Sequence, residues 1–458
     1  MPLESLAPEL VSIILRKIDS PRGLHDLIAA SPACLRVFLQ TPYLILSAVV
    51  RNALPSGTTN HYIAAWRAPP PSLPPLRETK DEILLFLNEY FSATTRFEFP
   101  ANQKELVSFL QLYHQVDYLV KMFLHQMRQL GFDDTILAPS SSESTRLHRA
   151  FLRYDIYCSV FAPNDFETLE RPYQFSGAEQ FDLFLRRLRP WEVEEMACVQ
   201  VYFALLTGDC ISQLEEQLIE AVQSTPGIVW PSSPDSKPGE ETGENGEKQI
   251  LSKGDDMREF KNLDITNLML FSKDGIYSSP DSITHMTALG LEIMYLLCKS
   301  EDRRSDLIRS NPPDYREFLP EALSHSPAWT PEGQNQGVSI EKTDSLDDPS
   351  RENLGYVLFG NNHNMGTVYL PIDPTGSHHS ILRRLGYIFW DSWRIQSPEV
   401  SDRLRAVEKM TYDEIHELFN RPWQNGAEAR LQGVKLPRDE FEKIEREFGY
   451  IENPADSE

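Results

Sequence analysis

Histidine-containing segments are the first candidates for chemistry in this chain, because imidazole is the commonest metal ligand. "HELFN" (416–420) begins like the zincin motif H-E-x-x-H, in which two histidines one helical turn apart bind zinc. Asn420 occupies the position of the second histidine, so the paired ligands are missing. His363, His378 and His379 lie in a glycine-rich stretch without a cysteine or carboxylate at ligand spacing. We therefore expect no metal ion and interpret these side chains as ordinary surface residues.

Motifs that would indicate covalent or nucleotide chemistry are absent from the sequence. There is no G-x-S-x-G nucleophile elbow, no G-x-x-x-x-G-K-[ST] phosphate loop and no G-x-G-x-x-G turn. The five cysteines are scattered and form no C-x-x-C pair, which predicts free, mostly buried thiols in a reducing compartment. These features predict a protein that is not an enzyme and needs no cofactor. A hydrolase or metal enzyme on a helical scaffold is the rival class.

The acidic composition limits the partners that we expect. The chain has 68 acidic and 44 basic residues, and its formal net charge is −24. Nucleic acids and anionic membranes require clustered Lys and Arg, so neither is expected as a partner. No apolar run reaches the roughly 18 residues of a membrane helix. Because the N-terminus also lacks the basic start of a secretory signal, we expect a cytoplasmic or nuclear protein.

Two clusters of large or charged side chains have both a structural and a functional interpretation. The densest basic run, "RRLR" (186–189), is expected to pair with Glu192, Glu194 and Glu195 along one helix surface. Trp390 and Trp393 are one helical step apart and are expected to face the core. A binding stripe formed by these tryptophans is the alternative.

Hydroxyl–proline pairs divide the N-terminal segment into short helices. Ser20-Pro21, Ser31-Pro32 and Thr41-Pro42 each combine an N-cap oxygen with a proline at the first helical position. Together with an apolar face that begins near Pro8, they predict four short helices within about 50 residues. Such helices are too short to be stable alone, so they must pack on each other or on a partner.

The rest of the sequence reads as one amphipathic helix after another, with little strand alternation. We therefore predict a mainly α fold in which a large irregular helical body follows the N-terminal module. The expected divisions are the helical module (1–55), a Pro-rich connector (56–79), the first part of the body (80–230), a disordered acidic insert (231–258), the second part of the body (259–450) with a loop at about 323–353, and a tail (451–458).

Residues 6–39, "LAPELVSIILRKIDSPRGLHDLIAASPACLRVFL", resemble an F-box. The match consists of a Leu/Pro/Glu/Leu opening, an Ile-Leu pair on the first helix and a Leu-x-x-Leu/Ile second helix. Ala7 separates the opening leucine from its proline, and Val37 and Phe38 stand where many F-boxes have a tryptophan. The matching residues, which are the expected partner contacts, are Leu6, Pro8, Glu9, Leu10, Ile14, Leu15, Ile18, Leu24, Leu27 and Ile28.

Three segments of the body look like those that recur in mostly uncharacterised F-box-like proteins of filamentous fungi. They are "FLRYDIYCSVF", "RPWEVEEMACVQVYF" and "LRRLGYIFWD". This resemblance implies that the N-terminal module docks an SKP-type adaptor and, through it, a cullin–RING ubiquitin ligase. The body would then bind an unknown protein substrate. The alternative is a helical interaction or scaffold protein with no ubiquitin link. An exposed apolar patch on residues 6–28 would favour the adaptor, whereas its burial against the body would favour the alternative.

Overall fold

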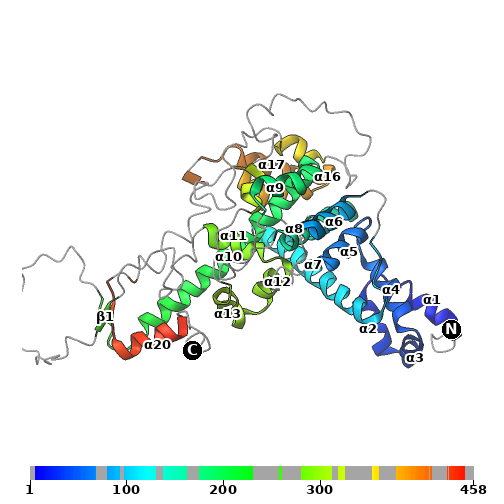
Figure 1. The fold of residues 1–458 in the computed structure, drawn as a ribbon, viewed down its shortest axis with the longest axis horizontal. Helices are drawn as coiled ribbons and strands as arrows, with labels where there is room; N and C mark the ends of the chain where they lie inside the picture. Colours follow the sequence, from blue (N-terminus) through cyan, green and yellow to red (C-terminus); the bar gives the residue numbers. More distant parts are fainter. Residues whose placement is uncertain are drawn as a thin grey trace, which may run out of the picture.

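The computed structural model describes residues 6–68, 80–92, 97–129, 138–161, 175–230, 257–259, 280–311, 318–324, 353–360, 378–411, 413–414, 431 and 433–448. Within these ranges the chain is mainly α-helical, as the sequence predicts. The molecule is elongated, with the N-terminal helices at one end and a small strand-containing unit at the other (Figure 1).

The N-terminal segment forms the four expected helices, which are α1 (Pro8–Leu15), α2 (Pro21–Ala30), α3 (Pro32–Gln40) and α4 (Pro42–Ala53). The Ser20 hydroxyl accepts a hydrogen bond from the Gly23 amide at 3.0 Å, and the Ser31 hydroxyl accepts one from the Cys34 amide at 3.4 Å. Thr41 also precedes its helix, but its side chain makes no such bond. The predicted helix starts are therefore confirmed, and two of the three hydroxyl groups act as caps.

These helices enclose a hydrophobic core of their own. Its buried members come from all four helices and are Val11, Leu15, Leu24, Cys34, Val37, Ile45 and Val49. Asn52 of α4 donates hydrogen bonds to the carbonyls of Arg16 and Ile18 at 2.9 and 3.0 Å. Because Arg16 caps α1, these bonds tie the end of that helix to α4. The position of α1 is thus set from inside the module.

Part of the range 56–79, where we expected a connector, forms a helix of the body. Helix α5 (Thr59–Arg67) lies in that range, and its residues Tyr62, Ile63 and Ala64 are buried in the main core. Tyr62 and Ile63 supply an apolar face that the proline-rich composition downstream obscured. The connector prediction is therefore wrong for residues 59–67, while residues 69–79 lie outside the described part of the chain.

The body is built from helices of very different lengths. They are α6 (Lys80–Phe91), α7 (Gln103–Gln129), α8 (Ser141–Val160), α9 (Gly177–Leu183), α10 (Pro190–Gln223), α11 (Pro280–Ala288), α12 (Leu291–Lys299), α13 (Arg304–Arg309), α14 (Leu319–Ser324), α15 (His378–Arg384), α16 (Ser392–Ile395) and α17 (Pro398–Val407). Single helical turns connect some of them, namely η2 (Leu185–Arg187), η3 (Glu301–Arg303), η6 (Tyr356–Gly360) and η8 (Tyr387–Phe389).

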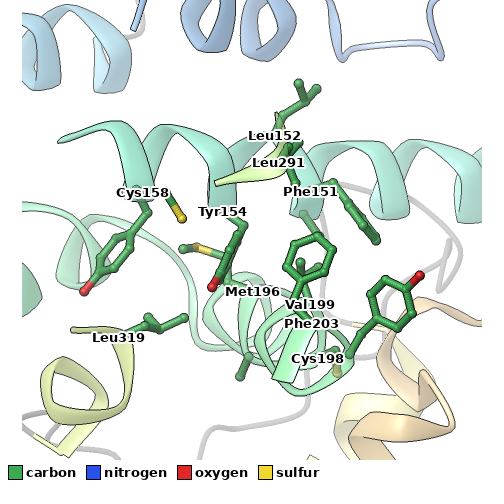
Figure 2. Packing of buried hydrophobic residues seen from close by; sticks show 14 of the residues in the cluster. Phe151, Leu152, Tyr154, Cys158, Met196, Cys198, Val199, Phe203, Leu291 and Leu319 are labelled. Atoms are coloured by element: carbon green, nitrogen blue, oxygen red, sulfur yellow. The ribbon is translucent and has the colours of Figure 1, made fainter. Parts of the chain in front are cut away.

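Helices α8 and α10 pack together at the centre of this body (Figure 2). Phe151 and Tyr154 of α8 meet Phe203 of α10, with ring centroids 5.6 and 5.4 Å apart. Edge-on contacts of this kind add about 0.5–1.5 kcal/mol each to the burial of the rings. By length and composition, α10 is long and apolar enough to cross a membrane, and so are α3 and α4 if these two helices, bent by 102°, are taken as one span. Since 71% of the apolar stretch of α10 is buried inside the protein, we interpret α10 as a core helix.

The far end of α10 carries a second, small core. Strands β1 (Met257–Glu259) and β2 (Lys435–Pro437) pair antiparallel, and α20 (Arg438–Phe448) follows β2. Leu218 and Val222 of α10 pack there with Leu436 of β2 and Ile444 of α20.

Several predicted divisions fall mostly outside the described residues. The acidic insert is described only at residues 257 and 258, which belong to β1, and the predicted loop only at its two ends, 323–324 and 353. The tail (451–458) is not described at all. These divisions therefore stay predictions.

Candidate functional site

The outer face of α1 is the strongest candidate for a binding site in the described residues. Leu10, Ile13 and Ile14 are 50%, 52% and 38% exposed, although all three are large and apolar. Their spacing of three and four residues makes them neighbours on one side of the helix. The opposite side carries Val11 and Leu15, which are buried in the module core. An eight-residue helix thus divides its apolar residues between a core and solvent.

The structure sorts the ten residues predicted to contact a partner into three groups. Those exposed are Pro8, Glu9, Leu10 and Ile14; those half-buried are Leu6, Ile18, Leu27 and Ile28; those fully buried are Leu15 and Leu24. The two buried leucines belong to the module core, so they support α1 and α2 from below and offer no surface to a partner. The half-buried residues pack against the same core.

Four large exposed apolar residues of the N-terminal module were missing from the predicted partner contacts. They are Ile13 of α1, Leu35 and Leu39 of α3, and Leu44 of α4. Ile13 was detectable, because the run Leu-Val-Ser-Ile-Ile-Leu is wider than the single apolar stripe of a surface helix. Leu35 and Leu39 are one turn apart and lie opposite the buried Cys34 and Val37, which only the packing of α3 reveals.

A second unusual region lies inside the body, where α8 directs charged side chains inward. Its buried charged residues are Glu143, Arg146, Arg149 and Arg153. Arg149 donates to Glu195 of α10 at 2.5 and 3.2 Å, and Arg153 donates to Glu192 at 2.8 Å. Burial tends to raise the pKa of Glu192, but the charges of Arg153 and Arg149 outweigh burial, and the net pKa is lowered.

The expected pairing of the "RRLR" run with the nearby glutamates is wrong for Arg186 and Arg187, whereas the backbone amide of Arg189 donates to Glu192 at 3.0 Å. Arg186 pairs with Asp182 at 3.2 Å and Arg187 donates to Asn88 at 2.9 Å, both on the surface. The carboxylates of Glu192 and Glu195 are bound by guanidinium groups of another helix, α8, which is buried beside α10. Local spacing cannot reveal such partners, which are 39 to 46 residues away in sequence.

Glu194 forms the third carboxylate site of this region, with α15. It accepts hydrogen bonds from Arg383 at 2.8 Å through both carboxylate oxygens, and it lies 2.9 Å from the His379 ring. Burial alone would raise its pKa, but Arg383 and His379 hold the pKa of Glu194 well below its usual range. The expectation of a surface His379 is wrong, since this side chain is fully buried. His363 and residues 416–420 lie outside the described residues.

The segment around α16 joins the N-terminus of α8 through two further pairs. Arg394 donates to both carboxylate oxygens of Glu143 at 2.7 Å, and Arg146 forms an ion pair with Asp391. Glu143 also accepts from the Ser140 amide at 2.8 Å, which completes a capping box at the start of α8. Every charge at this junction is thus met by an opposite charge, as burial requires.

The tryptophans near this junction have different environments. Trp390 is buried, as predicted, whereas Trp393 is 56% exposed and the core prediction is wrong for it. The Arg394 guanidinium lies over both rings, 5.1 Å from the centroid of Trp390 and 4.7 Å from that of Trp393. The cation therefore positions Trp393 although the ring faces solvent.

The cysteine thiols are unreactive groups of the interior. All five cysteines are free, and four are buried, as predicted. Burial raises the pKa of Cys210 to about 11 and that of Cys298 to about 12, which suppresses the reactive thiolate. Among the described side chains, no group of three or more His, Cys, Asp and Glu residues is arranged to hold a metal ion.

The interior charges thus find their partners within the chain, whereas no described residue covers the apolar face of α1. Comparison with known proteins adds no relative, since no family model, curated protein or solved structure matches the chain. The outer face of α1 is accordingly the feature on which a functional conclusion rests.

Proposed function

We propose that this chain is a helical interaction protein whose N-terminal module docks an SKP-type adaptor of a cullin–RING ubiquitin ligase. In this proposal the body binds a protein substrate and brings it close to the ubiquitin-charged enzyme. The chain itself catalyses nothing and acts by raising a local concentration.

The exposed apolar face of α1 carries this proposal. Leu10, Ile13 and Ile14 are held on a helix whose other side is anchored in a core, so binding need not order the helix first. Fully burying a Leu or Ile side chain contributes roughly 1.5–3 kcal/mol, and half-exposed side chains contribute about half of that each. The module also lies at one end of an elongated molecule, where a large partner has access (Figure 1).

The resemblance of residues 6–39 to an F-box supplies the identity of the partner. Pro8, Glu9, Leu10 and Ile14 are both members of the resembling pattern and exposed in the structure. Their exposure disfavours the alternative in which the same residues pack on the protein's own body.

Capture of a purified SKP-type adaptor by the full-length chain tests the proposal. We expect Leu10→Asp with Ile14→Asp to abolish capture, because two charges would enter the apolar contact. The folded state should survive, since both side chains are solvent-facing. The matched control is Leu85→Asp with Val107→Asp, two exposed apolar residues of α6 and α7, which should leave capture unchanged.

Two outcomes would reject this function. If the folded wild-type chain captures no adaptor, the scaffold without a ubiquitin link becomes the better conclusion. If both double variants bind as well as the wild type, the contact lies elsewhere on the molecule.

A further inference from the structure

The N-terminal module differs in charge from the rest of the chain. Residues 1–68 contain six basic and four acidic residues, whereas the whole chain contains 44 basic and 68 acidic ones. All of the excess negative charge therefore lies beyond residue 68. The N-terminal module is thus close to neutral, with a small excess of positive charge, within an otherwise acidic chain.

Exposed basic side chains border the apolar face of α1. Arg16 and Lys17 follow directly after that helix, and Lys17 lies one turn from Ile13 and Ile14. Neither cation takes part in an ion pair between residues that the structure describes. The single carboxylate of α1, Glu9, lies in the first turn, where the helix dipole stabilises it.

The neighbouring helix repeats this combination. α3 packs against α1 and exposes Leu35 and Leu39, with Arg36 beside them on the same outer side. Arg36 also has no ion-pair partner within the described ranges. Exposed leucine or isoleucine therefore lies beside a cation without an ion-pair partner among the described residues at two places, within α3 and directly after the end of α1.

We propose that the docking partner of this module is a protein whose apolar contact surface is bordered by Asp and Glu side chains. This inference rests on the proposed function and specifies the chemistry of the same site. Complementary charge at the rim of an interface accelerates association and selects against wrong partners. The acidic remainder of the chain would repel an extended polyanion such as a nucleic acid or an anionic bilayer. A compact acidic protein can contact the module alone and so avoids this repulsion.

Association kinetics of the full-length chain with the SKP-type adaptor test this inference. Rates are measured at about 0.02 M and about 0.5 M salt, between which the screening length changes severalfold. We expect Arg16→Glu with Lys17→Glu to slow association about tenfold at low salt and much less at high salt. Arg36→Glu should act in the same direction. The dissociation rate should change little, because the apolar contact remains.

The matched control carries the same change of charge on the body. Arg303→Glu with Lys409→Glu alters two exposed cations that are remote in sequence from the module. We expect this control to change the association rate less than about twofold at either salt concentration.

The outcomes separate the inference from the proposed function. Binding that Leu10→Asp with Ile14→Asp abolishes but Arg16→Glu with Lys17→Glu leaves unchanged at low salt would retain the docking site and overturn the acidic rim. Absence of adaptor binding in every variant, wild type included, would overturn both.

Two further measurements exclude other occupants of the site. Self-association of the wild type at low salt that Arg16→Glu with Lys17→Glu removes would assign the surface to a second copy of this chain. Module-dependent sedimentation with phosphatidylserine vesicles would assign it to a membrane. Either result would overturn the inference.

Discussion

Helices α1 and α8 expose and bury their side chains in opposite ways. α1 presents Leu10 and Ile13 to solvent, whereas α8 directs Arg146 and Arg149 into the interior. The difference lies in their neighbours among the described elements, since α8 is packed by α5, α7 and α10, whereas α1 packs against α3 and α4. Residue type alone therefore does not decide whether a side chain is buried. A buried charge requires an oppositely charged partner within the chain. An exposed apolar face remains available to a partner outside the chain.

Removing one member of a buried ion pair should give the largest effect. Arg394→Met leaves the Glu143 carboxylate fully buried without its bidentate partner, and we expect a loss of about 3–5 kcal/mol in the free energy of unfolding. Urea unfolding measures this loss. Arg186→Met, which breaks the exposed pair with Asp182, is the control and should cost less than about 1 kcal/mol. Equal losses of unfolding free energy in the two variants would mean that buried and exposed ion pairs do not differ in their contribution to stability.

Truncating the two sides of α1 should separate stability from binding. Leu15 is fully buried, so Leu15→Ala should destabilise the module by about 2–4 kcal/mol. Leu10→Ala should cost less than about 1 kcal/mol while weakening capture of the adaptor. Amide hydrogen exchange in residues 8–53 reports the stability of the module separately from that of the body. A large loss of protection in Leu10→Ala would mean that this residue supports the module core.

A partly buried carboxylate in α8 should give a smaller, pH-dependent effect. Burial raises the pKa of Asp155 to about 6, although its side chain accepts a hydrogen bond from the Leu291 amide at 3.0 Å. The native state therefore retains a proton that the unfolded state loses near pH 4, and this residue lowers stability as the pH rises from about 4 to 6.

Asp155→Asn keeps the hydrogen-bond acceptor and removes the titration. The variant should equal the wild type in stability near pH 4 and exceed it by about 1–2 kcal/mol above pH 6. Unfolding free energies measured across this pH range test the prediction. A variant less stable than the wild type at pH 7 would contradict it.

Local features of the sequence predicted much of the secondary structure. The helix starts at Pro21, Pro32 and Pro42 followed from short-range chemistry. A hydroxyl group can accept a hydrogen bond from a free amide of the first turn, and proline has no amide hydrogen that would lack a partner there. Amphipathic periodicity likewise predicted the mainly α body. The same reasoning missed α5, because the prolines that follow it dominated the composition of that region.

Prediction of the candidate site was partial for a physical reason. The resemblance to an F-box placed Leu15 and Leu24 among the expected partner contacts together with Leu10, but both leucines are buried in the module core. Which apolar residues remain exposed depends on where α3 and α4 pack, and those contacts are not encoded by spacing within α1. The partners of Glu192 and Glu194 were missed for the same reason.

The sequence by itself determined the helical class, the division of the N-terminus into short helices and the reversal of charge between residues 1–68 and the remainder. These properties depend on neighbours along the chain or on composition. Only the tertiary structure decided that Arg394 meets Glu143 and that Ile13 meets solvent. Both outcomes depend on desolvation, since a side chain is buried or exposed according to the helices that surround it.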